Sequence, residues 1–294
     1  MSNRLMISAI TWVGILLFLP ALFGQSTTPI SAEPKEKWND VVPLNKSAYA
    51  GRKSGPPPKH DLSGVWDGTA EGGGAYEGAR EYPEDGKPGH EPPYTPLGEQ
   101  VLNTHKPGVG VRGVAVEIGN DPVNICDPQG FPRMELYELR TIEIAQTTNQ
   151  VLYLDQFNDN WRIIWTDGRE LPKDPEPRWN GYSSGKWIDD YTFVAETVGM
   201  DERTWLDNSG RPHSSEMRVE EKFHRVSDDI LELTVTIDDP KMYTKPWVAI
   251  DKIPLHLQPK GFDMREMTCV PSETLDYNNQ IGARTATGGD WKGR

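Results

Sequence analysis

The sequence has little of what identifies several common protein classes. It contains only two cysteines in 294 residues, and its 31 basic residues are outnumbered by 44 acidic ones, which gives a formal net charge of −13. Nucleic acids and anionic membranes select for basic patches, so this balance argues against both as partners. The six histidines form neither an H-E-x-x-H pattern nor a Cys/His cluster. We therefore expect no metal site and no cofactor.

The one long apolar run lies at the N-terminus. Residues 1–24 read MSNRLMISAITWVGILLFLPALFG, with one arginine, an apolar run interrupted by Pro20, and small residues near Gly24. This layout is typical of a signal peptide, whereas a membrane-spanning helix needs about 20 apolar residues with anchoring flanks. We expect cleavage near Gly24 and a periplasmic or secreted bacterial protein, whose mature chain has no stable membrane span.

Both cysteines, Cys126 and Cys269, lie in the part of the chain that would be exported. In an oxidising compartment, an isolated pair of cysteines is expected to form a disulfide. Two unpaired thiols and a catalytic cysteine are the alternatives that the sequence leaves open.

Proline, glycine and polar residues divide the exported chain into regions. Residues 25–60 are polar and proline-bearing, which predicts an extended linker. Residues 61–275 carry the hydrophobic pattern of one domain, and residues 276–294 form a polar tail. Within the domain, residues 71–96 contain EGGG and five prolines, which exclude a helix or a central strand and indicate an irregular insertion.

Alternation of apolar and polar residues predicts antiparallel strands over most of the domain, as in Leu231, Leu233 and Val235. The predicted strands are 62–69, 111–118, 139–145, 151–157, 161–165, 182–187, 191–198, 217–226, 230–237 and 247–253. One short helix is predicted from Pro96 to about Thr104, with Thr95 as its N-cap. Such short strands joined by polar turns predict an all-β fold, an antiparallel up-and-down barrel of about 8–10 strands that protects its edges by closure.

The first predicted strand, DLSGVWDGT, contains Gly64, Val65 and Trp66. This tripeptide resembles the G-x-W signature of lipocalin-like (calycin) barrels, in which the tryptophan plugs the closed end. Stretches such as TDGRELP, GYSSGKW, RTWLD and TIDDPKMYTKPW are similar to a group of exported soil-bacterial proteins of unknown function. The resemblance implies a lipocalin-like barrel and brings no activity with it.

Two glycine-rich stretches match catalytic or nucleotide-binding motifs. GYSSG (residues 181–185) matches the G-x-S-x-G nucleophile elbow with Ser183 as the nucleophile, but an elbow needs a strand before the serine and a helix after it. Here the proline-rich KDPEPRWN precedes the motif and a predicted hairpin follows it. GVGVRG (residues 108–113) leads into a predicted strand, not into a helix that could hold a pyrophosphate. We interpret both as structural.

The connection formed by residues 199–215 is too long for a hairpin loop and contains Arg203, Trp205, Asp207 and His213. In one interpretation it is a lid over a barrel mouth, with Trp205 against a ligand and Arg203 or His213 on a polar group. In the other, Trp205 anchors the segment on the outer sheet, and Arg203 forms a surface ion pair with Asp207.

Two acidic residues, Asp155 and Glu221, share strand faces with apolar residues. A buried carboxylate is costly unless it is paired, and burial raises its pKa, which is how general bases arise. The alternative is that these faces are only partly covered, or that each carboxylate meets an arginine such as Arg162 or Arg218.

These patterns predict an exported protein that holds a small hydrophobic or amphipathic molecule in a barrel cavity. Tryptophan and tyrosine supply apolar walls with a polar handle. The candidate ligand-binding residues are Tyr153, Trp165, Arg203, Trp205 and Trp247. One alternative is a hydrolase or isomerase on the same barrel that uses His213, Asp155 or Glu221 as its base. Another is a cell-envelope interaction protein that uses the proline-rich segments.

Overall fold

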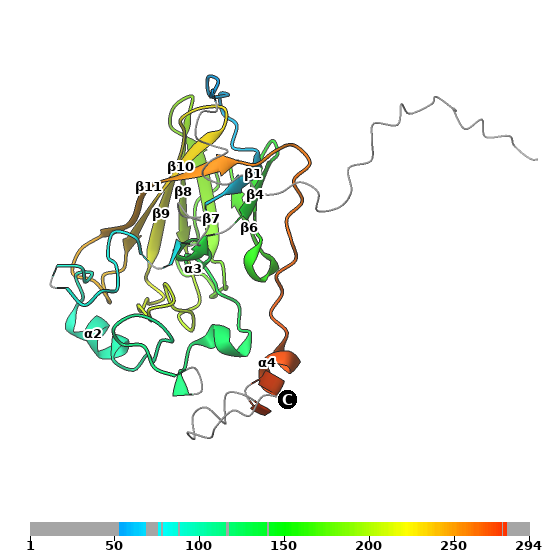
Figure 1. Ribbon diagram of the computed structural model, residues 1–294. Coiled ribbons are helices and arrows are strands. Elements are labelled where there is room, and N and C mark those ends of the chain that lie inside the picture. Colours follow the sequence, from blue (N-terminus) through cyan, green and yellow to red (C-terminus); the bar gives the residue numbers. More distant parts are fainter. Residues whose placement is uncertain are drawn as a thin grey trace, which may run out of the picture. The chain divides into compact units, whose positions relative to one another are not determined.

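The computed structural model describes residues 53–68, 76–77, 79–87, 89–115, 118–139, 141–277 and 279–280. The predicted signal peptide and most of the predicted linker lie outside the described residues. Nine strands close into a barrel in the order β1-β11-β10-β9-β8-β7-β6-β5-β4, and β1 pairs with both β11 and β4 (Figure 1). The predicted closed barrel is therefore confirmed.

The strands of the barrel are β1 (Gly64–Asp67), β4 (Thr141–Gln146), β5 (Gln150–Asp155), β6 (Asn160–Trp165), β7 (Tyr182–Trp187), β8 (Thr192–Val198), β9 (Arg218–Arg225), β10 (Ile230–Asp238) and β11 (Trp247–Leu257). A separate pair is formed by β2 (Tyr76–Glu77) and β3 (Tyr137–Leu139). The helices are α2 (Pro96–Leu102), α3 (Arg133–Leu136) and α4 (Pro271–Tyr277), with the 3₁₀ turns η2 (Pro122–Ile125) and η3 (Phe157–Asp159).

The strand directions differ from the purely antiparallel order that the sequence predicts. β6 and β7 run parallel, through the pairs Ile164↔Ser183 and Trp165↔Ser184, whereas the other neighbours are antiparallel. Around a closed ring, strand direction can alternate throughout only if the number of strands is even, so nine strands require a parallel pair. The long connection of residues 166–181 supplies the crossover that parallel neighbours need. The purely antiparallel, lipocalin-like order is not confirmed.

The alternation in β10 places one row of side chains in the core. Leu231, Leu233, Val235 and Ile237 are fully buried. Trp66 of the Gly-Val-Trp tripeptide is also fully buried, and the guanidinium carbon of Arg225 lies 4.4 Å from the centre of its ring. These side chains form an apolar core inside the barrel, because the inward face of each strand carries every second residue.

The predicted helix is confirmed as α2, and its start is the one that the sequence indicates. The side chain of Thr95 accepts a hydrogen bond from the backbone N–H of Gly98 at 3.0 Å, which satisfies one of the free donors of the first turn. Gly98 is needed there, because a Cβ atom at this position would overlap the carbonyl oxygen of Met242.

The predicted strand over residues 111–118 is wrong for the residues described there, 111–115 and 118. The backbone N–H groups of Gly113 and Val114 donate to Gly110 and Pro107 in local turns, and Val111 is 60% exposed. The β-branched pattern resembles a strand, but the closed barrel offers no free edge for another strand to join.

The disulfide between Cys126 and Cys269 is present, as the sequence predicts. It connects the residue after η2 with the segment before α4, and the two cysteines are 143 residues apart. The disulfide thus fits a protein that folds in an oxidising compartment.

We expect the double variant Cys126→Ser/Cys269→Ser to lose about 2–5 kcal/mol of unfolding free energy, because a cross-link over so long a loop restricts the unfolded chain. Urea unfolding followed by tryptophan fluorescence measures the loss. Reduction of the unmodified protein should shift the midpoint to that of the variant, and equal midpoints for the oxidised protein and the variant would contradict the expectation.

Candidate functional site

A charged cluster lies inside the barrel among apolar side chains. Arg162 points inward because it lies on the buried face of β6, and it forms an ion pair with Glu221 of β9. The same guanidinium nitrogen lies 3.5 Å from a carboxylate oxygen of Glu135 in α3. Both glutamates are fully buried, and the ring centre of Phe131 lies 3.9 Å from the guanidinium carbon. These side chains are therefore in contact with one another inside the barrel.

The surroundings of Glu135 favour its neutral, protonated form. Burial, and after it the charge of Glu221, raises the pKa of Glu135 well above its ordinary value, and the positive charge of Arg162 only partly opposes this. Asp155 of β5 adds to the rise. A carboxyl group whose pKa is raised in this way keeps its proton to higher pH than an ordinary glutamate does.

The barrel wall opens next to this cluster, where β6 and β7 run parallel. Only two residue pairs join the strands. Beyond them, the side-chain amide of Asn180 takes the place of backbone bonds and donates to the carbonyl of Trp161 at 2.9 Å and to the side chain of Asn160 at 2.8 Å. A cleft of about 670 Å³ lies here, which we term the β6–β7 cleft. Its lining includes Trp161, Arg162, Trp165, Trp179, Tyr182 and Ser183.

Aromatic rings line the cleft, and arginines cover several of them. The guanidinium carbons of Arg169 and Arg178 lie 3.4 Å from the ring centre of Trp165 and 4.1 Å from that of Tyr182, respectively. The ring of Trp161 is uncovered on the outside, since this residue is 62% exposed. Cations stack favourably on such rings, so the rim of the cleft combines apolar surface with arginines, of which Arg169 is paired with Asp167.

Ser183 lies on the floor of the cleft and is almost fully buried. Its hydroxyl lies 2.8 Å from the hydroxyl of Thr197. Ser183 is inside strand β7, and strand β8 follows, so the strand–turn–helix geometry of a nucleophile elbow is missing. Packing explains both glycines of GYSSG, because Gly181 has a φ of +62° and a Cβ at Gly185 would overlap the ring of Phe193.

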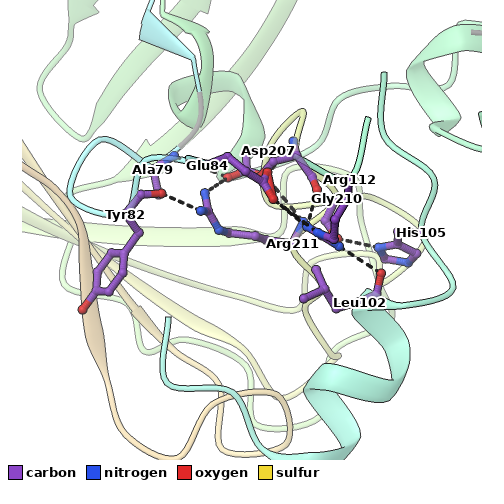
Figure 2. Close-up of polar contacts among 10 residues, drawn as sticks. Ala79, Tyr82, Glu84, Leu102, His105, Arg112, Asp207, Gly210 and Arg211 are labelled. Atoms are coloured by element: carbon purple, nitrogen blue, oxygen red, sulfur yellow. Dashed lines mark hydrogen bonds and ion pairs between the residues drawn. The ribbon is translucent and has the colours of Figure 1, made fainter. Parts of the chain in front are cut away.

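A second buried network holds residues 199–215 in place (Figure 2). Asp207 and Arg211 form an ion pair of 2.6 Å that is almost completely buried, and Arg211 also donates to the carbonyl of Tyr82. Next to them, Arg112 pairs with Glu84 at 2.9 Å and donates to the carbonyl of Ser209 at 2.7 Å. The segment is therefore tied to residues 82–112, which precede the main run of strands.

The other residues that the sequence singles out in this segment do not line the β6–β7 cleft. Trp205 is buried and stacks on His105, with ring centres 4.6 Å apart. His213 is buried beside Thr204, with 2.8 Å between the imidazole Nε2 and the hydroxyl, and burial lowers its pKa. Arg203 is exposed and pairs with Asp201, not with Asp207.

The remaining candidates divide between the cluster and other parts of the core. Glu221 forms an ion pair with Arg162, and the ring centre of Tyr153 lies 5.1 Å from the guanidinium carbon of the same arginine. Asp155 accepts a hydrogen bond from the backbone N–H of Phe157 at 3.0 Å. Trp165 lines the cleft, whereas Trp247 packs in the core against Tyr82 and Tyr243.

Sequence reasoning missed Glu135, Trp161 and Trp179. Glu135 belongs to a four-residue helix with no strand periodicity around it, and Trp161 faces outward from its strand. The local sequence contains no signal for Glu135, because only the fold brings it to Arg162. The aromatic content around GYSSG was the available signal for the cleft.

Glu135→Gln tests the protonation of the cluster. A carboxyl group whose folded pKa is raised loses its stabilising effect as pH rises from its unfolded to its folded pKa, with a slope of about 1.4 kcal/mol per pH unit. We therefore expect the unfolding free energy of the unmodified protein to fall with rising pH above the ordinary glutamate range, and that of Glu135→Gln to fall less steeply. Urea unfolding across this range measures both slopes. Glu143→Gln, at an exposed position, is the control, and a slope unchanged by Glu135→Gln would refute the assignment.

Two arginines of residues 199–215 should differ sharply in their effect on stability. Arg211→Ala leaves Asp207 buried without its partner, which should cost about 3–5 kcal/mol. Arg203→Ala removes an exposed ion pair and should cost less than about 1 kcal/mol. Chemical unfolding of the two variants compares them directly, and similar losses would contradict the burial that separates the two pairs.

Comparisons with known proteins identify no family. No protein-family model matches the chain, and no match was found among curated proteins. Within the residues that the structure describes, no group of three or more His, Cys, Asp or Glu side chains is arranged to hold a metal ion. No helix in the same part of the chain is long and apolar enough to cross a membrane. The function has to be inferred from the geometry of the site.

Proposed function

We propose that the protein binds a small amphipathic molecule in the β6–β7 cleft. The observation that carries this proposal is the cleft itself, whose volume of about 670 Å³ falls in the range of small-molecule sites. Such sites combine aromatic walls with a few polar groups. Here Trp161, Trp165 and Tyr182 supply the walls, and Arg162 and Ser183 supply the polar floor.

The proposed site is in the wall of the barrel, not in its interior as the sequence suggests. Phe131 and Arg162 occupy the interior at the level of α3, so the space nearest to them is the opening between the strands. Of the residues expected to contact a ligand, Trp165 belongs to this site. Tyr153 supports it indirectly through its contact with Arg162.

The geometry favours binding over the hydrolase or isomerase alternative. A general base must reach the substrate with a free acceptor. His213 is buried against Thr204 outside the cleft lining, and Glu221 is bound to Arg162. Ser183 bonds to other hydroxyl and guanidinium groups, none of which accepts a proton readily at neutral pH.

The proline-rich residues do not favour the envelope-interaction alternative. The backbone N–H of Glu81 donates to the carbonyl of Ala249 in β11, and Tyr94 packs on Tyr243 with ring centres 5.4 Å apart. This stretch therefore packs on the barrel domain, and less of its surface is accessible to a separate partner. The disulfide supports the exported location that we propose for the protein.

Titration with fatty acids, terpenoids and aromatic acids, followed by quenching of tryptophan fluorescence, tests the proposal. We expect saturable quenching by members of at least one class, and a flat response to all three would refute binding. Trp161→Ala should weaken the affinity about five- to tenfold, because truncating an aromatic contact costs about 1 kcal/mol or more. Tyr277→Ala, an exposed aromatic residue outside the cleft lining, is the matched control and should leave the affinity unchanged.

A further inference from the structure

The hydrogen bonds of Arg162 are unevenly distributed over its guanidinium group. Nη2 contacts the carboxylates of Glu221 and Glu135. Nη1 has only two long contacts, 3.5 Å to the hydroxyl of Ser183 and 3.4 Å to that of Thr197. Nε has no hydrogen-bond partner in the described part of the chain. An ionised group buried with poorly filled donors is costly, so Nη1 would gain from a better acceptor than these two hydroxyl groups.

Nη1 lies next to a residue that lines the β6–β7 cleft, Ser183. Ser183 and Arg162 both line the cleft, and Nη1 is the guanidinium nitrogen nearest to the Ser183 hydroxyl. An oxygen atom that enters between β6 and β7 can therefore meet Nη1 and the Ser183 hydroxyl together. A hydroxyl group can turn its hydrogen toward a new acceptor, so Ser183 is able to donate to such an oxygen.

The charges around Arg162 determine what kind of acceptor can bind. The ionisable groups that face it are Glu221 from β9, Glu135 from α3 and Tyr153 from β5, and Asp155 of β5 acts on Glu135. While Glu135 keeps its proton, it adds no negative charge beside the arginine. A second anion on the Nη1 side is then tolerated, whereas an ionised Glu135 would repel it.

We propose that the ligand of the β6–β7 cleft is an amphipathic carboxylic acid, whose carboxylate binds Nη1 of Arg162 and the hydroxyl of Ser183. Its apolar body lies along Trp161 and Trp165, next to Arg169, which stacks on Trp165 and pairs with Asp167. This inference rests on the proposed binding function and adds the charged group of the ligand.

Matched pairs of a carboxylic acid and its primary amide test the inference on the full chain. The probes are 4-phenylbutyrate, dodecanoate and indole-3-acetate, each with its amide, and calorimetry at neutral pH measures the affinities. We expect at least one acid to bind ten times or more tighter than its amide. Equal affinities within every pair would overturn the carboxylate inference and leave the binding function intact. If no acid or amide binds, and the quenching panel is also flat, the proposed function fails as well.

Two neighbouring serines supply the variants, since a change at the buried Arg162, which pairs with Glu221, endangers folding. Ser183→Ala removes the buried hydroxyl and should lower the affinity for the acid about fivefold, with little effect on the amide. Ser184→Ala is the control, because the hydroxyl of Ser184 donates to the carbonyl of Arg169 instead. Equal effects of the two substitutions on the acid would contradict the proposed position of the carboxylate.

The pH dependence of binding gives a readout that a merely structural role of Glu135 would not affect. The affinity for the acid should fall as pH rises through the raised pKa of Glu135, because its ionised carboxylate would repel the ligand. Glu135→Gln should remove this fall, and the amides should bind equally at all pH values. A fall that persists unchanged in Glu135→Gln would refute the role of this residue.

Discussion

A closed ring with an odd number of strands must contain a parallel pair, and the features proposed to be functional follow from this constraint. In the barrel, β6 and β7 take that place, and residues 166–181 cross from one strand to the next. The crossover leaves these strands joined by only two residue pairs, as few as join β1 and β11. The β6–β7 cleft occupies the gap, and residues of the crossover such as Arg169 and Trp179 become part of its lining.

The second determinant is the cost of burying charge. Arg162 is placed inside the barrel by the alternation of β6, and an unpaired charge there would be strongly destabilising. Glu221 from β9 pairs with it across the barrel, and Glu135 from α3 approaches from another part of the chain. A similar pair is buried elsewhere: both terminal nitrogens of Arg133 donate hydrogen bonds to the carboxylate of Asp121, at 2.7 and 2.6 Å. Buried arginine–carboxylate pairs thus fix the irregular segments relative to the strands.

The success of sequence reasoning depended on how local each signal was. Period-two alternation located the hairpins of β4–β5, β7–β8 and β9–β10, because it reflects burial on one face of a strand. The N-cap at Thr95 could also be predicted from the sequence, since its hydrogen bond joins residues only three positions apart. Residues 111–115 have the residue pattern of a strand but no partner strand. A local pattern could not show this, because strand pairing depends on the whole sheet. Glu135 could not be predicted as a site residue for a related reason, because its contact is with Arg162, which is 27 residues away in the sequence.

The sequence alone determined the all-β class, the position of most strands, the disulfide and the finding that GYSSG is not a nucleophile elbow. Each of these depends on nearest neighbours along the chain, or on there being only two cysteines to pair. The tertiary structure decided the number of strands, hence the parallel pair, the gap in the wall and the side chains that surround Arg162. These depend on how the ends of the sheet meet, which is settled by closure of the barrel and not by any local pattern.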